Sequence, residues 1–251
     1  KIAIDMINEK GGVDGYRIRP TYADAQSKAE VAISEAERLI SQERVDMLMG
    51  VYSSAHCVPM AQKTDAAKKF FWMNVCVASA VLKDKKLQYA FRPQVHSDQF
   101  GEASCAFLNE NSEKKMGIKP AALKVAIIYE DGPYGAGVAA GNEAACKKNG
   151  MQLVLKEGYS ATAPDLSSLV TKLRRARPDV ILHTGYNPHI TPLLRQSTEQ
   201  GLKLKALIGH GAGKRTATVA EQLAVREVPA RRRAVVGQEH RAASMRSDMD
   251  C

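Results

Sequence analysis

The segment GVYSSAHCVP, residues 50–59, contains the most informative junction of this sequence. An apolar run, Val45–Val51, leads directly into Ser53 and Ser54, and serine commonly begins helices. A strand that ends at a helix N-terminus brings backbone N–H groups, hydroxyl groups and the positive end of the helix dipole to one point. Such a point suits a carboxylate or a phosphate. A simpler interpretation, in which one serine only caps the helix, stays open here.

Short apolar runs rich in β-branched residues alternate with helical patterns along the chain, which is typical of parallel sheets covered by helices. The expected strands are residues 16–23, 45–51, 70–75, 88–92, 125–129, 151–159, 180–184 and 205–208. The expected helices are residues 2–8, 27–41, 54–67, 100–109, 135–149, 167–175 and 190–199. The pattern predicts an α/β fold with two similar lobes, residues 1–95 and 96–213, and a separate tail, residues 214–251.

Composition predicts a soluble globular protein, because 45% of the 251 residues are hydrophobic and 25% are charged. No apolar run approaches the roughly 20 residues that span a bilayer, and no signal peptide is recognisable at Lys1. The net charge of +9 is mostly scattered among acidic residues before residue 214, so it does not indicate a nucleic-acid partner. The five cysteines lack metal-site spacing, and we expect no metal and no cofactor.

Two tyrosines follow expected strands in the second lobe. Tyr134 comes shortly after residues 125–129, and Tyr186 comes shortly after residues 180–184. Ligands of open α/β sheets bind beyond the carboxyl ends of the strands, and tyrosine offers an aromatic face with a hydroxyl group. Both tyrosines are therefore candidates for ligand stacking, and a purely structural role at the sheet end is the alternative.

Six segments occur in an order that carries a family resemblance. They are AIDMINEKGGVDGYRI (3–18), LMGVYSSAHCVPMA (48–61), FWMNVCVASAVL (71–82), YAFRPQVHSDQFG (89–101), VAIIYEDGPYGAGV (125–138) and ILHTGYNPHITPLLRQSTEQGLK (181–203). Together they resemble the substrate-binding proteins of branched-chain amino acid ABC transporters over residues 2–213. The resemblance implies the type I periplasmic binding fold, with two doubly wound parallel-sheet lobes joined by a hinge. That fold is expected to be incomplete here, without the first strand and without the end of the second lobe.

The resemblance also implies a ligand site. The matching positions are a serine pair, a short turn and two tyrosines: Ser53, Ser54, Val77, Ala78, Ser79, Tyr134 and Tyr186. One serine of the pair, Ser53 or Ser54, is expected to bind a carboxylate, and the turn is expected to hold carboxylate and ammonium groups through its backbone. The two lobes of the family close over a small ligand, and a membrane permease recognises the closed form.

The same resemblance implies a monomeric, periplasmic protein that has a permease partner and no enzymatic activity. Ser53 and Ser54 have His56 nearby, but the third group that would orient such a base is not apparent. A ligand-sensing regulatory domain of the same fold is the alternative function.

One position departs from the family pattern. Amino-acid binders of this family place an acidic residue after the strand at residues 205–208, where it pairs with the ligand ammonium, and this sequence has His210 there. A neutral imidazole carries no compensating charge. We therefore hypothesise a ligand that keeps the carboxylate and lacks the α-ammonium, such as a branched or aromatic organic acid; a hinge role for His210 is the alternative.

Several single residues carry smaller expectations. Trp72 is expected in the core because tryptophan buries a large apolar area. Cys57 and Cys76 lie near the expected site and are able to pair in an exported protein, although the sequence does not fix connectivity. His183 and His189, with His210, lack acidic or cysteine partners at ligand spacing, so a metal site is not expected.

The tail, residues 214–251, has eight basic and five acidic side chains and little apolar periodicity. Its run VPARRRAVV, residues 228–236, is open to two interpretations, a nucleic-acid or membrane-surface patch and an artefact of a frameshifted or mispredicted end. We favour the artefact, because the family sequence would continue the second lobe at this point.

Overall fold

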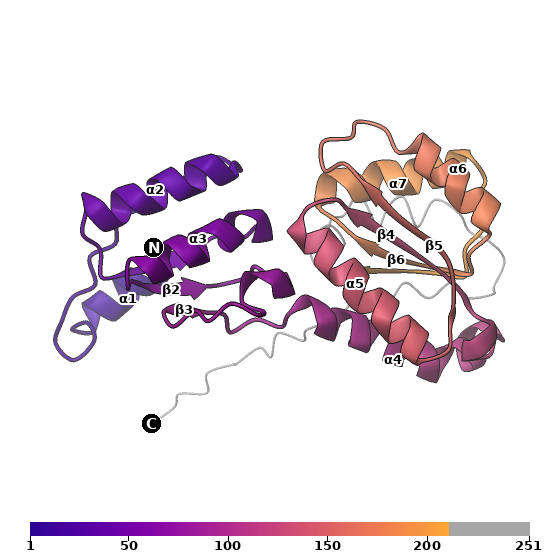
Figure 1. Ribbon diagram of the computed structural model, residues 1–251, viewed down its shortest axis with the longest axis horizontal. Coiled ribbons are helices and arrows are strands. Elements are labelled where there is room, and N and C mark those ends of the chain that lie inside the picture. The colour runs from indigo at the N-terminus through magenta and orange to yellow at the C-terminus, as the bar shows by residue number, and fades with distance from the viewer. Residues whose placement is uncertain (211–251) are drawn as a thin grey trace, which may run out of the picture. The chain divides into compact units, whose positions relative to one another are not determined.

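The computed structural model describes residues 1–210 of the chain, so the tail expectations lie outside the described residues. Internal contacts divide the chain into two compact units. Of the described residues, the first contains Lys1–Gln99 with Gly132–Gly137, and the second contains Phe100–Asp131 with Val138–His210. Each unit has a parallel sheet with helices packed on it, which confirms the α/β fold class (Figure 1).

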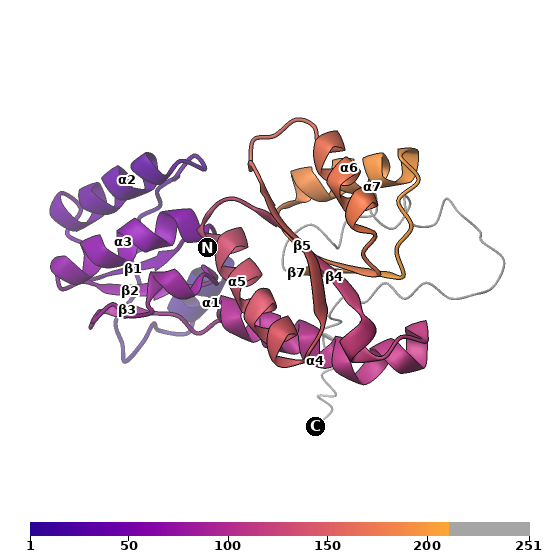
Figure 2. The ribbon, with the colours of Figure 1, turned by 45° about the vertical axis from the view of Figure 1, so that its right-hand side comes forward.

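The first unit has a three-stranded parallel sheet in the order β1-β2-β3. Its elements are α1 (Ile2–Glu9), α2 (Ala29–Ser41), β1 (Met47–Gly50), α3 (Ser54–Ala66), β2 (Phe70–Met73), the short 3-10 helix η1 (Ser79–Val81) and β3 (Ala90–Phe91). The views in Figures 1 and 2 show α2 and α3 side by side over this sheet. Each strand leads through a connection toward the next, so the carboxyl ends of β1 and β2 lie at the same edge.

Side-chain alternation along β2 decides which residues form the core of the first unit. Phe71 and Met73 are fully buried with residues of α2 and α3. Because successive strand residues point to opposite faces, Trp72 lies on the other face, where Phe70 stacks between Trp72 and Phe91 with ring centroids 6.2 and 4.9 Å away. That face is less covered, and Phe91 is 43% exposed. The expectation that Trp72 belongs to the buried core is therefore wrong.

The strand expected at residues 16–23 is also absent. The described structure has only an isolated antiparallel bridge between Val13 and Tyr16 there. A β-strand requires a neighbouring strand to pair its backbone groups, and the described sheet of this unit contains only β1, β2 and β3. Apolar alternation alone was therefore insufficient to form a strand at this position.

The second unit has a four-stranded parallel sheet in the order β5-β4-β6-β7. Its elements are α4 (Ser97–Met116, beginning in the first unit), η2 (Pro120–Ala122), β4 (Lys124–Glu130), α5 (Pro133–Lys148), β5 (Gln152–Tyr159), α6 (Ser167–Ala176), β6 (Val180–Thr184), α7 (Asn187–Glu199) and β7 (Ala206–His210). Figure 2 shows α4 and α5 on one side of this sheet and α6 and α7 on the other.

The central strands β4 and β6 contribute side chains to two separate hydrophobic cores, one on each face of the sheet. Val125 and Ile127 pack with residues of α4 and α5, whereas Ala126 and Ile128 pack with residues of α6 and α7. A strand buried on both faces reads as a continuous apolar run, which is why β6 was predicted with the bounds that the structure shows.

Helices α4 and α5 approach each other closely at two glycines. A Cβ atom on Gly101 would overlap the backbone of Gly141 and lie 2.5 Å from the backbone nitrogen of Asn142. One turn further along α4, Cys105 lies 3.7 Å from the carbonyl oxygen of Asn142. Cys105 and Cys146 are both fully buried and are not in a disulfide bond.

A surface ion-pair network in the second unit should give a measurable pH dependence. Glu143 of α5 contacts Lys147 at 2.7 Å and Lys156 of β5 at 2.6 Å. Hydrogen bonds from Lys147 and then Lys156 lower the pKa of Glu143 from 4.5 to about 2. A lowered folded-state pKa stabilises the fold above the unfolded value, and this stabilisation is lost as the pH falls from about 4.5 toward 2.

We expect Glu143→Gln to flatten the decline of the urea midpoint between pH 5 and pH 2, because the variant lacks this titration. The exposed carboxylate Glu110 provides a matched control, and Glu110→Gln should leave the profile close to that of the unaltered protein. Parallel pH profiles for Glu143→Gln and the unaltered protein would contradict the lowered pKa of Glu143.

Candidate functional site

The junction between β1 and α3 places both predicted serines at the beginning of a helix. Ser53 is the N-cap of α3, and its side chain accepts a hydrogen bond from the N–H of Ala55 at 3.3 Å. Ser54 is 2% exposed, and its hydroxyl oxygen accepts a hydrogen bond from the N–H of Ala78 at 3.1 Å. The capping interpretation thus holds for Ser53, whereas Ser54 joins the two segments that the sequence assigned to the ligand.

The second junction, from β2 to η1, is tied to the first by further contacts. The N–H of Cys76 points to the carbonyl oxygen of Tyr52 at 3.4 Å. A disulfide bond joins Cys76 to Cys57 in α3, with Cα atoms 6.1 Å apart. The pairing that the sequence left open is therefore present in the structure. We call Val51–Ser54 together with Cys76–Ser79 the first-unit cradle.

Both halves of the cradle begin with left-handed backbone. Val51 has φ of 37° and Cys76 has φ of 46°. L-residues with side chains rarely adopt positive φ, and a β-branched residue such as valine is strained there. Such a conformation persists only where the surrounding contacts hold it, and in the cradle the Cys57–Cys76 disulfide is one of them.

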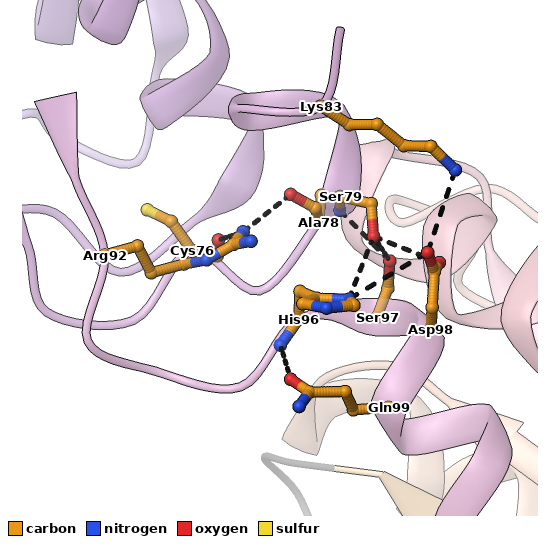
Figure 3. A network of polar contacts seen from close by, with 9 residues as sticks. All are labelled: Cys76, Ala78, Ser79, Lys83, Arg92, His96, Ser97, Asp98 and Gln99. Atoms are coloured by element: carbon orange, nitrogen blue, oxygen red, sulfur yellow. Dashed lines mark hydrogen bonds and ion pairs between the residues drawn. The ribbon is translucent and has the colours of Figure 1, made fainter. Parts of the chain in front are cut away.

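The hydroxyl group of Ser79 lies in a polar network rather than isolated in the cradle (Figure 3). It contacts the hydroxyl oxygen of Ser97 at 2.7 Å and donates to the carboxylate of Asp98 at 3.0 Å. Asp98 also lies 3.8 Å from the ammonium of Lys83 and 3.9 Å from Nδ1 of His96. The side chains of these outer contacts are at least 40% exposed, and exposed ion pairs contribute little stability. Ser79 is thus bound to the segment that begins α4.

Arg92 contacts the first-unit cradle, and sequence reasoning did not identify it. Its Nη1 atom donates to the carbonyl oxygens of Cys76 and Ala78, each at 2.8 Å (Figure 3). Partial burial lowers the pKa of Arg92, and the charge of Asp98 opposes this shift. The only sequence signal was an arginine between β3 and Pro93, which does not reveal that its partners are two carbonyl groups.

The two predicted tyrosines, Tyr134 and Tyr186, lie just beyond the carboxyl ends of β4 and β6. Tyr134 is in the first turn of α5, is 7% exposed, and falls in the segment Gly132–Gly137 that groups with the first unit. Tyr186 is the N-cap of α7, and its N–H lies 3.4 Å from Nδ1 of His189. Both positions agree with the rule for open α/β sheets, and their ligand roles stay predictions.

His210 ends β7 in a buried position. It is 4% exposed, and its Nε2 lies 2.7 Å from the hydroxyl of Ser104. Its Nδ1 lies 3.1 Å from both the hydroxyl of Thr184 and the carbonyl oxygen of His183. A carbonyl only accepts hydrogen bonds, so the contact with the oxygen of His183 requires a hydrogen on Nδ1. The ring thus links β7, β6 and α4, and a ligand contact of His210 stays a prediction.

The other two histidines of the second unit also serve buried contacts. The Nε2 atom of His183 lies 2.9 Å from the hydroxyl of Tyr159, and their rings stack. His189 packs edge-on against Tyr159 and bonds the carbonyl oxygen of Ala161 at 2.7 Å. Burial raises the pKa of Tyr159, so this hydroxyl keeps its proton at neutral pH. Within residues 1–210, no group of three His, Cys, Asp or Glu side chains is placed to hold a metal ion.

A sequence profile of the periplasmic binding protein family matches residues 1–228. The chain belongs to the periplasmic binding protein family. Within the family it is similar to Leu/Ile/Val-binding protein homolog 7 of Brucella suis, with 35% identity over 213 residues, which is 85% of this chain and 53% of that protein. Homolog 8 of Brucella abortus is 35% identical over 85% of this chain and 52% of its own length. The chain thus spans about half the length of the curated relatives it matches.

Solved structures of periplasmic binding proteins share the fold of this family member. The branched-chain amino acid transporter substrate-binding protein LivJ of Streptococcus pneumoniae, in complex with isoleucine, matches with a TM-score of 0.72 and 22% identity, over 88% of this chain and 60% of that one. The leucine-binding protein LivK of Thermotoga maritima matches with a TM-score of 0.74 and 22% identity, over 87% and 59%. These matches confirm the type I periplasmic binding fold.

The described part of this periplasmic binding protein, residues 1–210, contains no helix that is both long and apolar enough to cross a membrane.

Proposed function

We propose that this chain is the ligand-binding part of an ABC importer and that it binds a small carboxylate of the branched-chain amino acid type outside the cytoplasm. Family membership and the names of the Brucella relatives support this class of ligand. The neighbour LivJ, which holds isoleucine, supports it through the shared fold. A membrane permease is the corresponding partner. Binding and release, without a chemical reaction, are sufficient for this role.

The observation that carries the proposal is the cross-linked first-unit cradle. The Ser54 hydroxyl and the Cys57–Cys76 disulfide hold a helix N-terminus beside a second strand end. A helix N-terminus favours an anion through its N–H groups and its dipole. Holding these groups in place before binding reduces the entropy lost when a ligand is ordered. The cradle therefore has the chemistry and the rigidity that a carboxylate requires.

A second ligand class is favoured by one observation, the histidine at the end of β7. His210 occupies the place where the family resemblance gives an acidic partner for the ammonium, and a neutral ring supplies no charge there. A branched or aromatic acid without an α-ammonium is therefore the second candidate. Burying an ammonium without a counter-charge is unfavourable.

Calorimetric titration of the purified chain distinguishes the two classes. We expect leucine, isoleucine or valine to bind if the first class is correct, and 4-methylpentanoate to bind more tightly than leucine if the second is correct. Leucinamide, which lacks the carboxylate, should bind in neither case. Tight binding of leucinamide would contradict the carboxylate cradle.

The variant Ser54→Ala should lower the affinity for the best ligand by about tenfold or more, which is typical for losing a hydrogen bond to a charged group. Ser41→Ala, at an exposed serine at the end of α2, is the matched control and should bind as the unaltered chain does. Equal affinities of the two variants would count against the cradle.

A further inference from the structure

The turn Cys76–Ser79 is held at every residue by the segment that follows β3. Arg92 binds the carbonyl oxygens of Cys76 and Ala78. The N–H of Ser97 donates to the carbonyl oxygen of Val77 at 2.8 Å, and the hydroxyl oxygen of Ser97 accepts from the N–H of Ser79 at 3.0 Å. Figure 3 shows Arg92 and Ser97 meeting this turn from the same connection. The conformation of the turn thus depends on residues 92–97.

The two carbonyl groups that Arg92 binds belong to particular peptide planes. The plane that contains the Cys76 carbonyl also contains the N–H of Val77, and the plane with the Ala78 carbonyl contains the N–H of Ser79. In a trans peptide the C=O and N–H groups point in opposite directions. Fixing the two carbonyls therefore fixes the direction of the two N–H groups, on the side away from the guanidinium.

A single guanidinium nitrogen performs both contacts. Nη1 has two hydrogens, so it can donate one to each carbonyl, and hydrogen bonds from a charged donor are stronger than neutral ones. Cys76 has left-handed backbone with φ of 46°, so without a restraint the turn would tend to relax. The disulfide restrains one end of the turn at Cys76, whereas Arg92 reaches Ala78 as well.

We propose that Arg92 is a positioning residue of the ligand site. By holding the carbonyls of Cys76 and Ala78, it sets the direction of the Val77 N–H, which is offered to the ligand, and of the Ser79 N–H, which donates to Ser97. This inference rests on the proposed function for its ligand, but the restraint itself is a property of the ligand-free chain. Arg92 does not touch the ligand in this scheme. It acts through the two peptide planes.

Two measurements test the proposal on the full chain with the variants Arg92→Met and Arg92→Lys. The first is amide hydrogen exchange of Ser79 without ligand, because its N–H group shares a peptide plane with the Ala78 carbonyl and is hydrogen-bonded in the structure. The second is the calorimetric affinity for the best ligand. Arg38→Met is the control, since Arg38 is a half-buried arginine of the same unit that pairs with Glu35 and Glu43 on the surface.

We expect Arg92→Met to accelerate exchange of the Ser79 amide and to weaken ligand binding, each by about tenfold or more. Arg92→Lys should recover part of both losses, because an ammonium can donate to at least one of the carbonyls. Arg38→Met should change neither quantity.

The outcomes separate this inference from the proposed function. Unchanged amide exchange in Arg92→Met overturns the positioning role, whatever the ligand affinity. Accelerated exchange in a chain that binds no carboxylate or amino acid supports the restraint and contradicts the proposed function. If Arg92→Met does not fold, Arg92→Lys with exchange and affinity equal to the unaltered chain overturns the positioning role.

Discussion

Gly101→Ala is expected to destabilise the second unit by about 1–3 kcal/mol, the range for overpacking a well-packed interior. A loss of stability is unusual for this substitution, because replacing a glycine within a helix by alanine normally raises the free energy of unfolding by up to about 1 kcal/mol. The reason is the contact between α4 and α5. The new Cβ would overlap the backbone of Gly141, and backbone atoms cannot turn aside as a flexible side chain can.

Urea unfolding followed by circular dichroism measures this effect. Glu102→Ala changes the adjacent, exposed position of the same helix and is the matched control, for which we expect an unchanged or slightly higher midpoint. A Gly101→Ala protein as stable as the control would show that the two helices can separate without cost.

The second large effect is expected at the disulfide of the cradle. Replacing Cys57 and Cys76 by serine should lower the stability of the first unit by about 3 kcal/mol, which is typical for a loop of this length; the two residues are 19 apart in sequence. The cross-link restricts the unfolded chain in the usual explanation, and its removal releases the turn after β2 as well.

Fluorescence of Trp72 reports this transition, because it is the single tryptophan of the chain and lies in β2. A reducing agent should lower the unfolding midpoint of the unaltered protein and leave that of the double serine variant unchanged. A reductant effect of equal size on both proteins would contradict a stabilising Cys57–Cys76 bond.

Strong local signals explain the parts of the fold that the sequence predicted correctly. The apolar run Val180–Thr184 is bounded by Pro178 and Gly185, and β6 has those bounds. Helix α4 begins at Ser97, earlier than the expected residue 100. The sequence pattern missed this first turn because the turn is polar and lacks apolar periodicity. Residues 16–23 have a strand-like pattern, but strand formation depends on pairing that no local pattern records.

The candidate site was predictable to a similar degree. The serines at a strand end and the turn Val77–Ser79 were found from local pattern and resemblance. Their mutual contact, between Ser54 and Ala78, was not, because it depends on β1 and β2 being neighbours. The contacts of Arg92 with the turn after β2, and those of the His210 ring with Ser104 and Thr184, were not predicted for the same reason, since their partners are distant in sequence or are backbone groups.

The state of the cysteines gives the two units different chemical behaviour. Cys57 and Cys76 are joined, whereas Cys105 and Cys146 are sealed thiols between α4 and α5. An alkylating reagent can reach the latter pair only after the second unit opens. In a Cys251→Ser background, the rate of alkylation would therefore measure how often the second unit opens under native conditions. This measurement is independent of unfolding of the first unit, which Trp72 fluorescence reports.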